Sequence, residues 1–166
     1  PLCQSKNHSL IFKDSLREYI KCSDCDFVFV PKTYHLSEID EKLRYDTHNN
    51  DPMDTRYREF LSQLTVPLLE KILEKSDGLD FGSGPGPTLS LMLEEAGHCV
   101  ELYDKFYASN EHIFTKRFDF ITATEVIEHL REPRFELKRL TAILKPGGYL
   151  ALMTQILTKE INFSDW

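Results

Sequence analysis

Three glycines at alternate positions constrain this chain more than any other feature of its sequence. Gly82, Gly84 and Gly86 stand in the stretch GLDFGSGPGP, directly after the short apolar run 79–81. Glycine has no Cβ atom, so it accepts positive φ angles and allows another group to approach the backbone closely. Glycines this dense predict a tight strand-to-helix turn against which a ligand lies; the alternative is a tight turn that binds nothing.

The residues after position 60 alternate between runs typical of strands and runs typical of helices. Such alternation predicts an α/β fold with a Rossmann-like, doubly wound and mostly parallel sheet. Thr65 is expected to cap the first helix, and Leu137, Leu140 and Leu144 to face inward from the last one. Strands are expected near 78–81, 99–104, 118–124 and 149–154, and helices at 65–75, 87–96 and 133–144.

The 166 residues divide into three parts by composition, and the length suits one domain with a small appendage. Residues 1–31 form a cysteine-containing β segment. Residues 32–60 are highly charged and form a helix-and-loop cover with a break near 49–52. Residues 61–166 form the Rossmann-like part.

Composition excludes several kinds of partner. The net charge of −7 argues against nucleic acid and slightly favours a small-molecule partner. No apolar run approaches the roughly 20 residues that span a bilayer, and no secretory signal is visible. Four cysteines then indicate reduced thiols or metal ligands, and a cytoplasmic location.

The spacing around the glycines discriminates among ligands. The pattern G-x-G-x-G follows Asp80, and no Walker lysine comes after it, which excludes a P-loop. Asp104 ends the second expected strand, 22 residues after Gly82, where a carboxylate can accept hydrogen bonds from both hydroxyls of a ribose. An NAD-type oxidoreductase would have G-x-G-x-x-G, whereas here Gly86 comes one residue early and Pro87 follows it.

Four stretches in this order, LDFGSGPG, ELYD, FDFITATEVIEHL and LKPGGYLALMT, together resemble the class I S-adenosylmethionine-dependent methyltransferases over roughly residues 60–155. The resemblance implies an S-adenosylmethionine cofactor and an acceptor that the sequence does not identify. It places Asp80, Gly82, Gly84 and Gly86 at the amino-acid end of the cofactor, Asp104 on the ribose, and Thr124 and Glu125 near the cofactor and the substrate entrance.

The chain departs from that family in two places. Only 13 residues separate Asp104 from Phe118, too few for the usual helix and strand, so no adenine-binding acid is assigned. The chain also ends at Trp166, soon after the last expected strand. We therefore expect the family's closing antiparallel hairpin to be missing and the chain to be a fragment.

Proton transfer is needed only if the acceptor must lose a proton. His129 and Glu128 in EVIEHL are the candidate catalytic residues by position, although a histidine there is equally consistent with a structural role. Tyr45 and His48 in RYDTHNN are expected to close over the cofactor from the N-terminal side; the alternative is a polar helix and turn that cover the sheet.

The N-terminal cysteines have the spacing of a zinc knuckle. Cys22 and Cys25 form CSDC, and Cys3 precedes them by 18 intervening residues. A fourth ligand is expected either from a cysteine before Pro1 or from His8; the alternative is three ordinary cysteines. Cys99 is expected in the core. A non-catalytic zinc-ribbon binding module therefore remains, with the NAD-type oxidoreductase, as an alternative to the methyltransferase.

Overall fold

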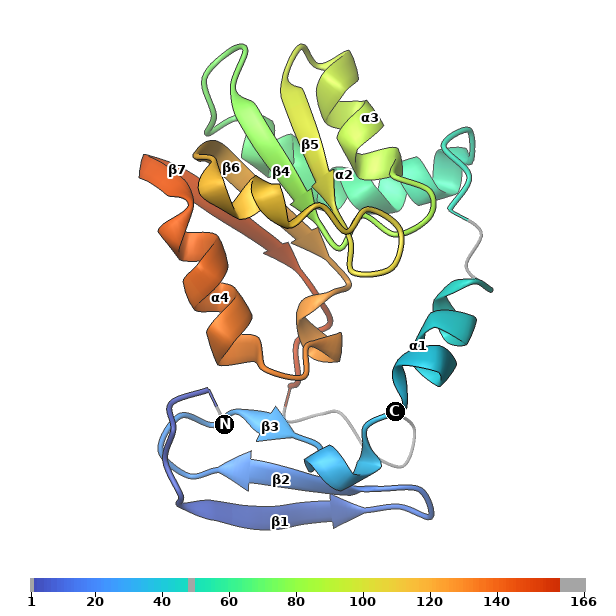
Figure 1. The fold of residues 1–166 in the computed structure, drawn as a ribbon, viewed down its shortest axis with the longest axis vertical. Helices are drawn as coiled ribbons and strands as arrows, with labels where there is room; N and C mark the ends of the chain where they lie inside the picture. Colours follow the sequence, from blue (N-terminus) through green and yellow to red (C-terminus); the bar gives the residue numbers. More distant parts are fainter. Residues whose placement is uncertain (1, 48–49, 159–166) are drawn as a thin grey trace.

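The structure, a computed structural model, describes residues 2–47 and 50–158. It contains a small antiparallel sheet at the N-terminal end and a larger parallel sheet, joined by helix α1, Glu38–Tyr45 (Figure 1). The carboxyl ends of the parallel strands point towards α1 and the small sheet. Within these described ranges, no helix is long and apolar enough to cross a bilayer.

The small sheet consists of β1, His8–Lys13, β2, Glu18–Cys22, and β3, Val28–Phe29, in the order β1-β2-β3. Its strands are mostly exposed or half-buried, and Cys22 is the one fully buried residue in the described part of 1–31. A short 3-10 helix, η1, Lys32–Tyr34, leads from it to α1. The sheet therefore has very little core of its own.

The larger sheet has the strand order β5-β4-β6-β7, with all neighbours parallel. The two central strands are buried on both faces, as is usual for parallel strands covered by helices. The chain places β5 on one side of β4 and β6 on the other, so the winding reverses at β4. The predicted Rossmann-like fold is thus confirmed. The strands are β4, Asp77–Phe81, β5, Cys99–Tyr103, β6, Phe118–Thr124, and β7, Leu144–Met153.

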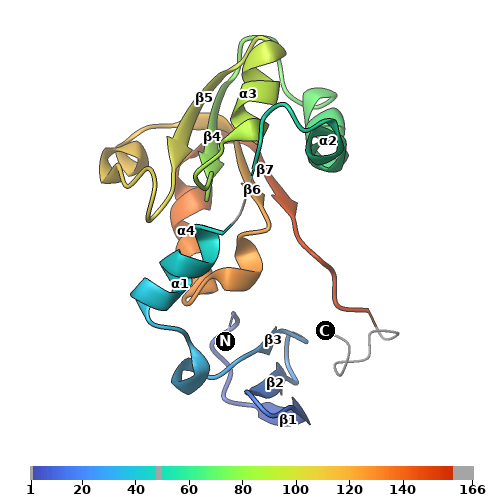
Figure 2. The ribbon, with the colours of Figure 1, turned by 90° about the vertical axis from the view of Figure 1, so that its right-hand side faces the viewer.

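Helices cover both faces of this sheet (Figure 2). Helices α2, Thr55–Leu69, and α3, Thr88–Glu95, pack with Phe120 of β6 on one face. Helix α4, Pro133–Ala142, and the 3-10 helix η2, Glu111–Thr115, cover the other face. Successive residues of a strand point to opposite faces, and accordingly Ile121 packs in the α4-side core.

The first helix of the larger part was placed wrongly by the sequence. Helix α2 begins ten residues earlier than Thr65, where the Asp54 side chain accepts hydrogen bonds from two backbone amides. Thr65 is buried inside the helix instead of capping it. Pro67 has no amide hydrogen, so it cannot donate a hydrogen bond to the carbonyl four residues earlier in the helix. The helix ends two residues later, at Leu69.

Two smaller expectations are also wrong. Leu144 packs against the core, as expected, but it belongs to β7, where it pairs with Phe118, and Ile143 fills the core beside α4. The segment KPGG is accommodated inside β7 as an irregularity in the pairing with β6, with Gly147 at φ +81°. Cys99 is exposed and not in the core, because it is the first residue of the edge strand β5.

Candidate functional site

The β4–α3 loop lies at the point where the winding of the sheet reverses. Gly82 and Gly84 have φ angles of +77° and +64°, which other residues rarely adopt. A Cβ atom on Gly82 would collide with Val126, and one on Gly86 would collide with the backbone of Asn50. The third glycine therefore makes room for the protein's own chain, whereas Gly84 has open space beyond the Asn50 amide.

Asp80 lies beneath this loop and is almost completely buried. Its carboxylate accepts a hydrogen bond from the Thr122 hydroxyl at 2.9 Å. Burial raises the pKa of Asp80 to about 6, the Thr122 bond opposes that rise, and the charge of Asp104 adds to it. Burial, with the charges of Asp80 and Glu125, also raises the pKa of Tyr57. A buried carboxylate of this kind is suited to a cationic ligand group.

Asp104 follows β5 and organises the ligand edge through its carboxylate. Oδ2 accepts the Gly84 amide at 3.0 Å, and Oδ1 accepts the amides of Phe106 and Tyr107 at 2.7 and 3.1 Å. An acid at this strand end would contribute little to the stability of the fold if it made no hydrogen bonds. Here it joins the glycine loop to the turn after β5, so it has a structural role as well.

Two hydroxyl groups at the same edge lack a hydrogen-bond partner among the described residues. Ser83 Oγ, between the first two glycines, and Thr124 Oγ1, at the end of β6, are buried without a hydrogen bond to the described protein. Buried polar groups are nearly always paired, so both fit a site that a polar ligand completes. Ser83 was not among the predicted site residues; its position between glycines was the available signal.

The residues after β6 form the other wall. Glu125 has a φ of +54°, unusual for a residue other than glycine, and its amide donates to Met153 O at 2.8 Å. Burial and then the charge of Glu128 raise the pKa of Glu125, while His129 opposes the rise. Glu128 and His129 lie exposed on the 3-10 helix η3, Ile127–His129. Backbone strain of this kind concentrates at functional sites.

Helix α1 brings Tyr45 to this wall. The Tyr45 ring lies edge-on to the His129 ring, with centroids 6.0 Å apart. Tyr45 therefore lies beside this wall, and its expected cover of the cofactor stays a prediction. His48 lies outside the described residues.

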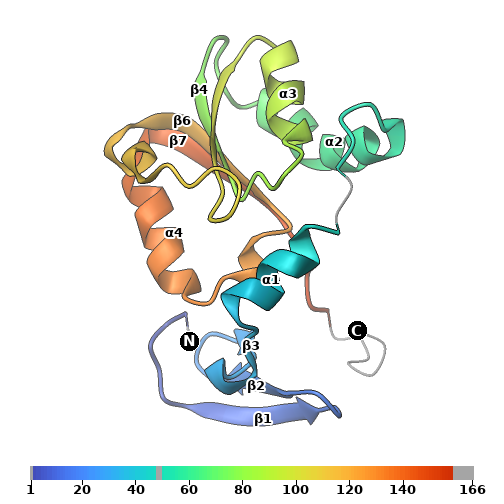
Figure 3. The same cartoon turned by 45° about the vertical axis from the view of Figure 1, so that its right-hand side comes forward.

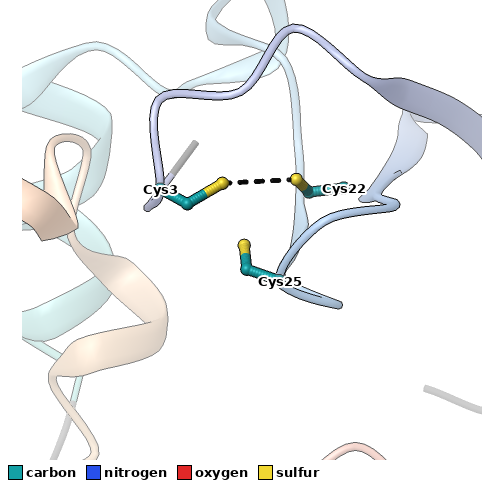
Figure 4. A group of neighbouring side chains, drawn as sticks. All are labelled: Cys3, Cys22 and Cys25. Atoms are coloured by element: carbon teal, nitrogen blue, oxygen red, sulfur yellow. Dashed lines mark hydrogen bonds between the residues drawn. The ribbon is translucent and has the colours of Figure 1, made fainter.

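The three N-terminal cysteines gather at one end of the small sheet (Figure 4). Their sulfur atoms all lie within 4.8 Å of one another, and those of Cys3 and Cys22 are 3.5 Å apart. His8 is not in the group, and its ring packs edge-on against Phe29 instead. Among the residues that the structure describes, no fourth candidate ligand joins the three.

Parallel strands with a reversal of winding, a glycine loop at the reversal and an acid after the next strand define a Rossmann-like cofactor domain of the class I methyltransferase type. The sequence comparison agrees: the methyltransferase domain family matches residues 53–165. The chain therefore belongs to this family. The expected S-adenosylmethionine-dependent methyltransferase resemblance is confirmed, and the comparison gives no support to the NAD-type alternative.

Individual relatives are more distant. The ubiquinone biosynthesis O-methyltransferase of Coxiella burnetii is 30% identical over 90 residues, which cover 52% of this chain and 38% of the relative. The proteins of the same name in Serratia proteamaculans and Photorhabdus laumondii are 29% and 27% identical over 77 residues, 46% of this chain and 32% of each relative. The chain thus spans about a third of the length of these curated relatives.

Proposed function

We propose that this chain binds S-adenosylmethionine and transfers its methyl group to a small-molecule acceptor. The observation that carries the proposal is the pair of unpartnered hydroxyls, Ser83 and Thr124, at the same edge as the glycine loop and Asp104. When bound, the cofactor supplies an electrophilic methyl group on a positively charged sulfur, so much of the rate comes from positioning.

Different residues of the chain are proposed to hold different parts of the cofactor. Asp80 and the glycine loop hold the amino-acid end; Gly84 faces the ligand, while Gly82 and Gly86 make room for Val126 and Asn50. Asp104 accepts the ribose hydroxyls, and Thr124 and Glu125 flank the entrance. The carboxylate of Asp104 already accepts three amides, which fixes its orientation before a ligand arrives. The pairing of Asp80 with Thr122 does the same beneath the loop.

Calorimetry tests the cofactor directly. We expect S-adenosylmethionine and S-adenosylhomocysteine to bind and NAD not to bind. Hydrogen bonds to a charged group contribute about 1.5–3 kcal/mol, so Asp104→Asn should weaken both by roughly ten- to a hundredfold. Glu101→Gln removes a carboxylate from the same strand, where it pairs with Lys116, and should leave binding unchanged.

A wild-type protein that binds neither ligand at millimolar concentration, or that binds NAD, would contradict the assignment. Because Asp104 also joins two loops, each variant needs a thermal unfolding curve. A loss of affinity that merely follows a loss of folding would leave Asp104 as a structural residue and refute its ribose role.

A small-molecule acceptor is supported by the acidic balance of the chain and by the name of the relatives, which are O-methyltransferases of ubiquinone biosynthesis. Transfer of a labelled methyl group to a catechol, a peptide or an RNA separates the classes. We expect labelling of the catechol; labelling of RNA or peptide alone would refute the proposal. If Glu128 or His129 removes the hydroxyl proton, Glu128→Gln or His129→Ala should lower kcat about a hundredfold or more.

We also propose that Cys3, Cys22 and Cys25 bind zinc. Three sulfur atoms within 4.8 Å of one another supply three of the four ligands of a tetrahedral site. Four free cysteines fit a reducing, cytoplasmic location for such thiolates. Elemental analysis and cobalt(II) substitution test the site, since thiolate ligation of cobalt gives an intense charge-transfer absorption.

The controls for the metal site lie in the same chain. Cys22→Ser should abolish metal binding, whereas Cys99→Ser, at an exposed thiol outside the cluster, should retain it. We expect tight, stoichiometric zinc when a fourth ligand is supplied ahead of Pro1, and weak or no zinc in this chain, because among the described residues only three sulfur atoms gather. Absence of metal from the protein with the fourth ligand, or equal binding by both variants made in it, would leave the cysteines as ordinary residues.

A further inference from the structure

Helix α1 is fastened across the ligand edge of the large sheet (Figure 3). On one side it contacts the loop after β5: Lys105 pairs with Glu38 at 2.6 Å, and the Tyr107 hydroxyl donates to Asp46 at 2.6 Å. These residues directly follow Asp104 in the chain. The helix is therefore tied to the segment proposed to hold the ribose.

On its other side α1 contacts the loop after β6. Arg131 donates to the carboxylate of Glu41 at 2.6 Å and to the carbonyl of Leu36 at 2.8 Å. Glu41 is largely shielded from solvent in this pair, with 17% of its side chain exposed, so the contact is less screened than a surface ion pair. Arg131 comes two residues after His129, so α1 spans both walls of the candidate site.

Tyr45, the last residue of α1, occupies the gap between these walls. Its ring centroid lies 6.0 Å from that of Phe106, in the β5 loop, and 6.0 Å from that of His129, in η3. The side chain is half-buried. An aromatic ring therefore stands between the loop that follows Asp104 and the 3-10 helix that carries Glu128 and His129.

The charges around Tyr45 are mostly negative. Burial, and then the carboxylates of Glu41, Asp104 and Glu128, raise the pKa of Tyr45 to about 12, against the opposing charge of Arg131. The phenol is thus neutral at physiological pH. A ring with a negative face among carboxylates favours a cation beside it.

We propose that Tyr45 is a cofactor-binding residue whose ring lies against the sulfonium group and recognises its positive charge. The proposal rests on the proposed binding of S-adenosylmethionine and adds a property that binding alone does not require. The protein distinguishes the charged cofactor from the neutral thioether of S-adenosylhomocysteine at this ring.

Calorimetry with the two ligands isolates that charge, because they share the ribose and the amino-acid group. Tyr45→Leu should weaken S-adenosylmethionine binding roughly three- to thirtyfold and leave S-adenosylhomocysteine binding nearly unchanged. Tyr45→Phe retains the ring and should retain the preference. Tyr34→Leu, at an exposed tyrosine in η1, is the matched control and should change neither affinity.

Leucine is a strong helix former, so α1 should persist in the variant; Tyr45→Met serves as a second non-aromatic variant if Tyr45→Leu does not fold. Equal weakening of both ligands would make Tyr45 a packing residue and overturn the proposal, as would unchanged binding of both. A wild-type protein that binds neither ligand would refute the proposed function itself, and with it the role of Tyr45.

Discussion

Asp80 shows how burial, the largest of three influences on its pKa, can set the chemistry of a single residue. Its pKa of about 6 means that the folded protein holds a proton more tightly than the unfolded chain. Without ligand, the stability that Asp80 contributes is therefore present below pH 4 and is lost as the pH rises through about 6. A cationic group bound above Asp80 would instead favour the ionised carboxylate over the protonated acid.

Cofactor affinity should accordingly depend on pH. Because the ammonium group of the ligand favours ionised Asp80, we expect the affinity for S-adenosylhomocysteine to fall as the pH is lowered from 7 to 5, by up to about tenfold per unit below pH 6. Calorimetry over this range measures it. His129 and Glu125 stand at the same site, so Asp80→Asn is the necessary control.

The Asn variant should bind more weakly at pH 7 and lose the steepest part of the pH dependence. If wild type and variant show the same pH profile, the titrating group is not Asp80, and its proposed contact with the amino-acid end is wrong.

At the scale of elements, two glycines allow the effect of backbone strain to be measured apart from the effect of ligand contact: one in the β4–α3 loop and one at the end of α3. Gly84 and Gly97 both have positive φ angles, +64° and +94°, but Gly97 ends α3 with nothing within 4 Å of an added Cβ. Alanine at either position should cost about 1–2 kcal/mol of folding free energy from the left-handed backbone alone. Chemical denaturation of both variants measures this cost.

Ligand binding should then distinguish the two alanine variants. We expect Gly84→Ala to weaken S-adenosylmethionine binding tenfold or more, and Gly97→Ala to leave it unchanged. Equal affinities would show that the cofactor does not approach the backbone at Gly84.

The elements that the sequence predicted well are those whose environment is simple. β6 was placed at 118–124 because FDFITAT is rich in the aromatic and β-branched residues that favour strands, and α4 began at Pro133 because proline favours the first helical turn. Helix α2 was misplaced because its charged first turns hid the stripe that continues through Leu61 and Leu64. The sequence placed Pro67 in the first turn of a helix, where proline is common, whereas it lies near the end of α2.

Site residues brought together by tertiary contacts were harder to predict. The motif residues Asp80, Gly84 and Asp104 lie at one edge because the strand order puts them there. Ser83 was missed although its position between glycines was a signal, because the sequence does not show that its hydroxyl is buried without a partner among the described residues. Tyr57 was missed because nothing local shows that the charge of Asp80 acts on it. The roles assigned to these residues remain predictions.

At the scale of the whole molecule, the two sheets differ in what stabilises them. The large sheet has packed cores on both faces, whereas the described part of 1–31 contributes one fully buried residue, Cys22. Contacts between the N-terminal part and the rest of the protein include a hydrogen bond from Arg134 to Leu2 O at 2.8 Å. Lys32, in the adjoining η1, also forms an ion pair with Glu132 at the surface. Exposed ion pairs contribute little. The small sheet therefore needs a further source of stability, and small modules of this size commonly obtain it from a metal.

If zinc binds at the cysteines as proposed, its removal should unfold the small sheet and spare the large one. Hydrogen exchange with mass spectrometry follows both in one experiment: after chelation, amides of β1 and β2 should exchange rapidly while those of β4 and β6 stay protected. Cys22→Ser should reproduce the chelated pattern without chelator, and Cys99→Ser should behave as wild type. Unchanged protection of β1 and β2 in the metal-free protein would mean that the contacts through Arg134 and Lys32 suffice, and that the cysteine cluster is not what holds the sheet together.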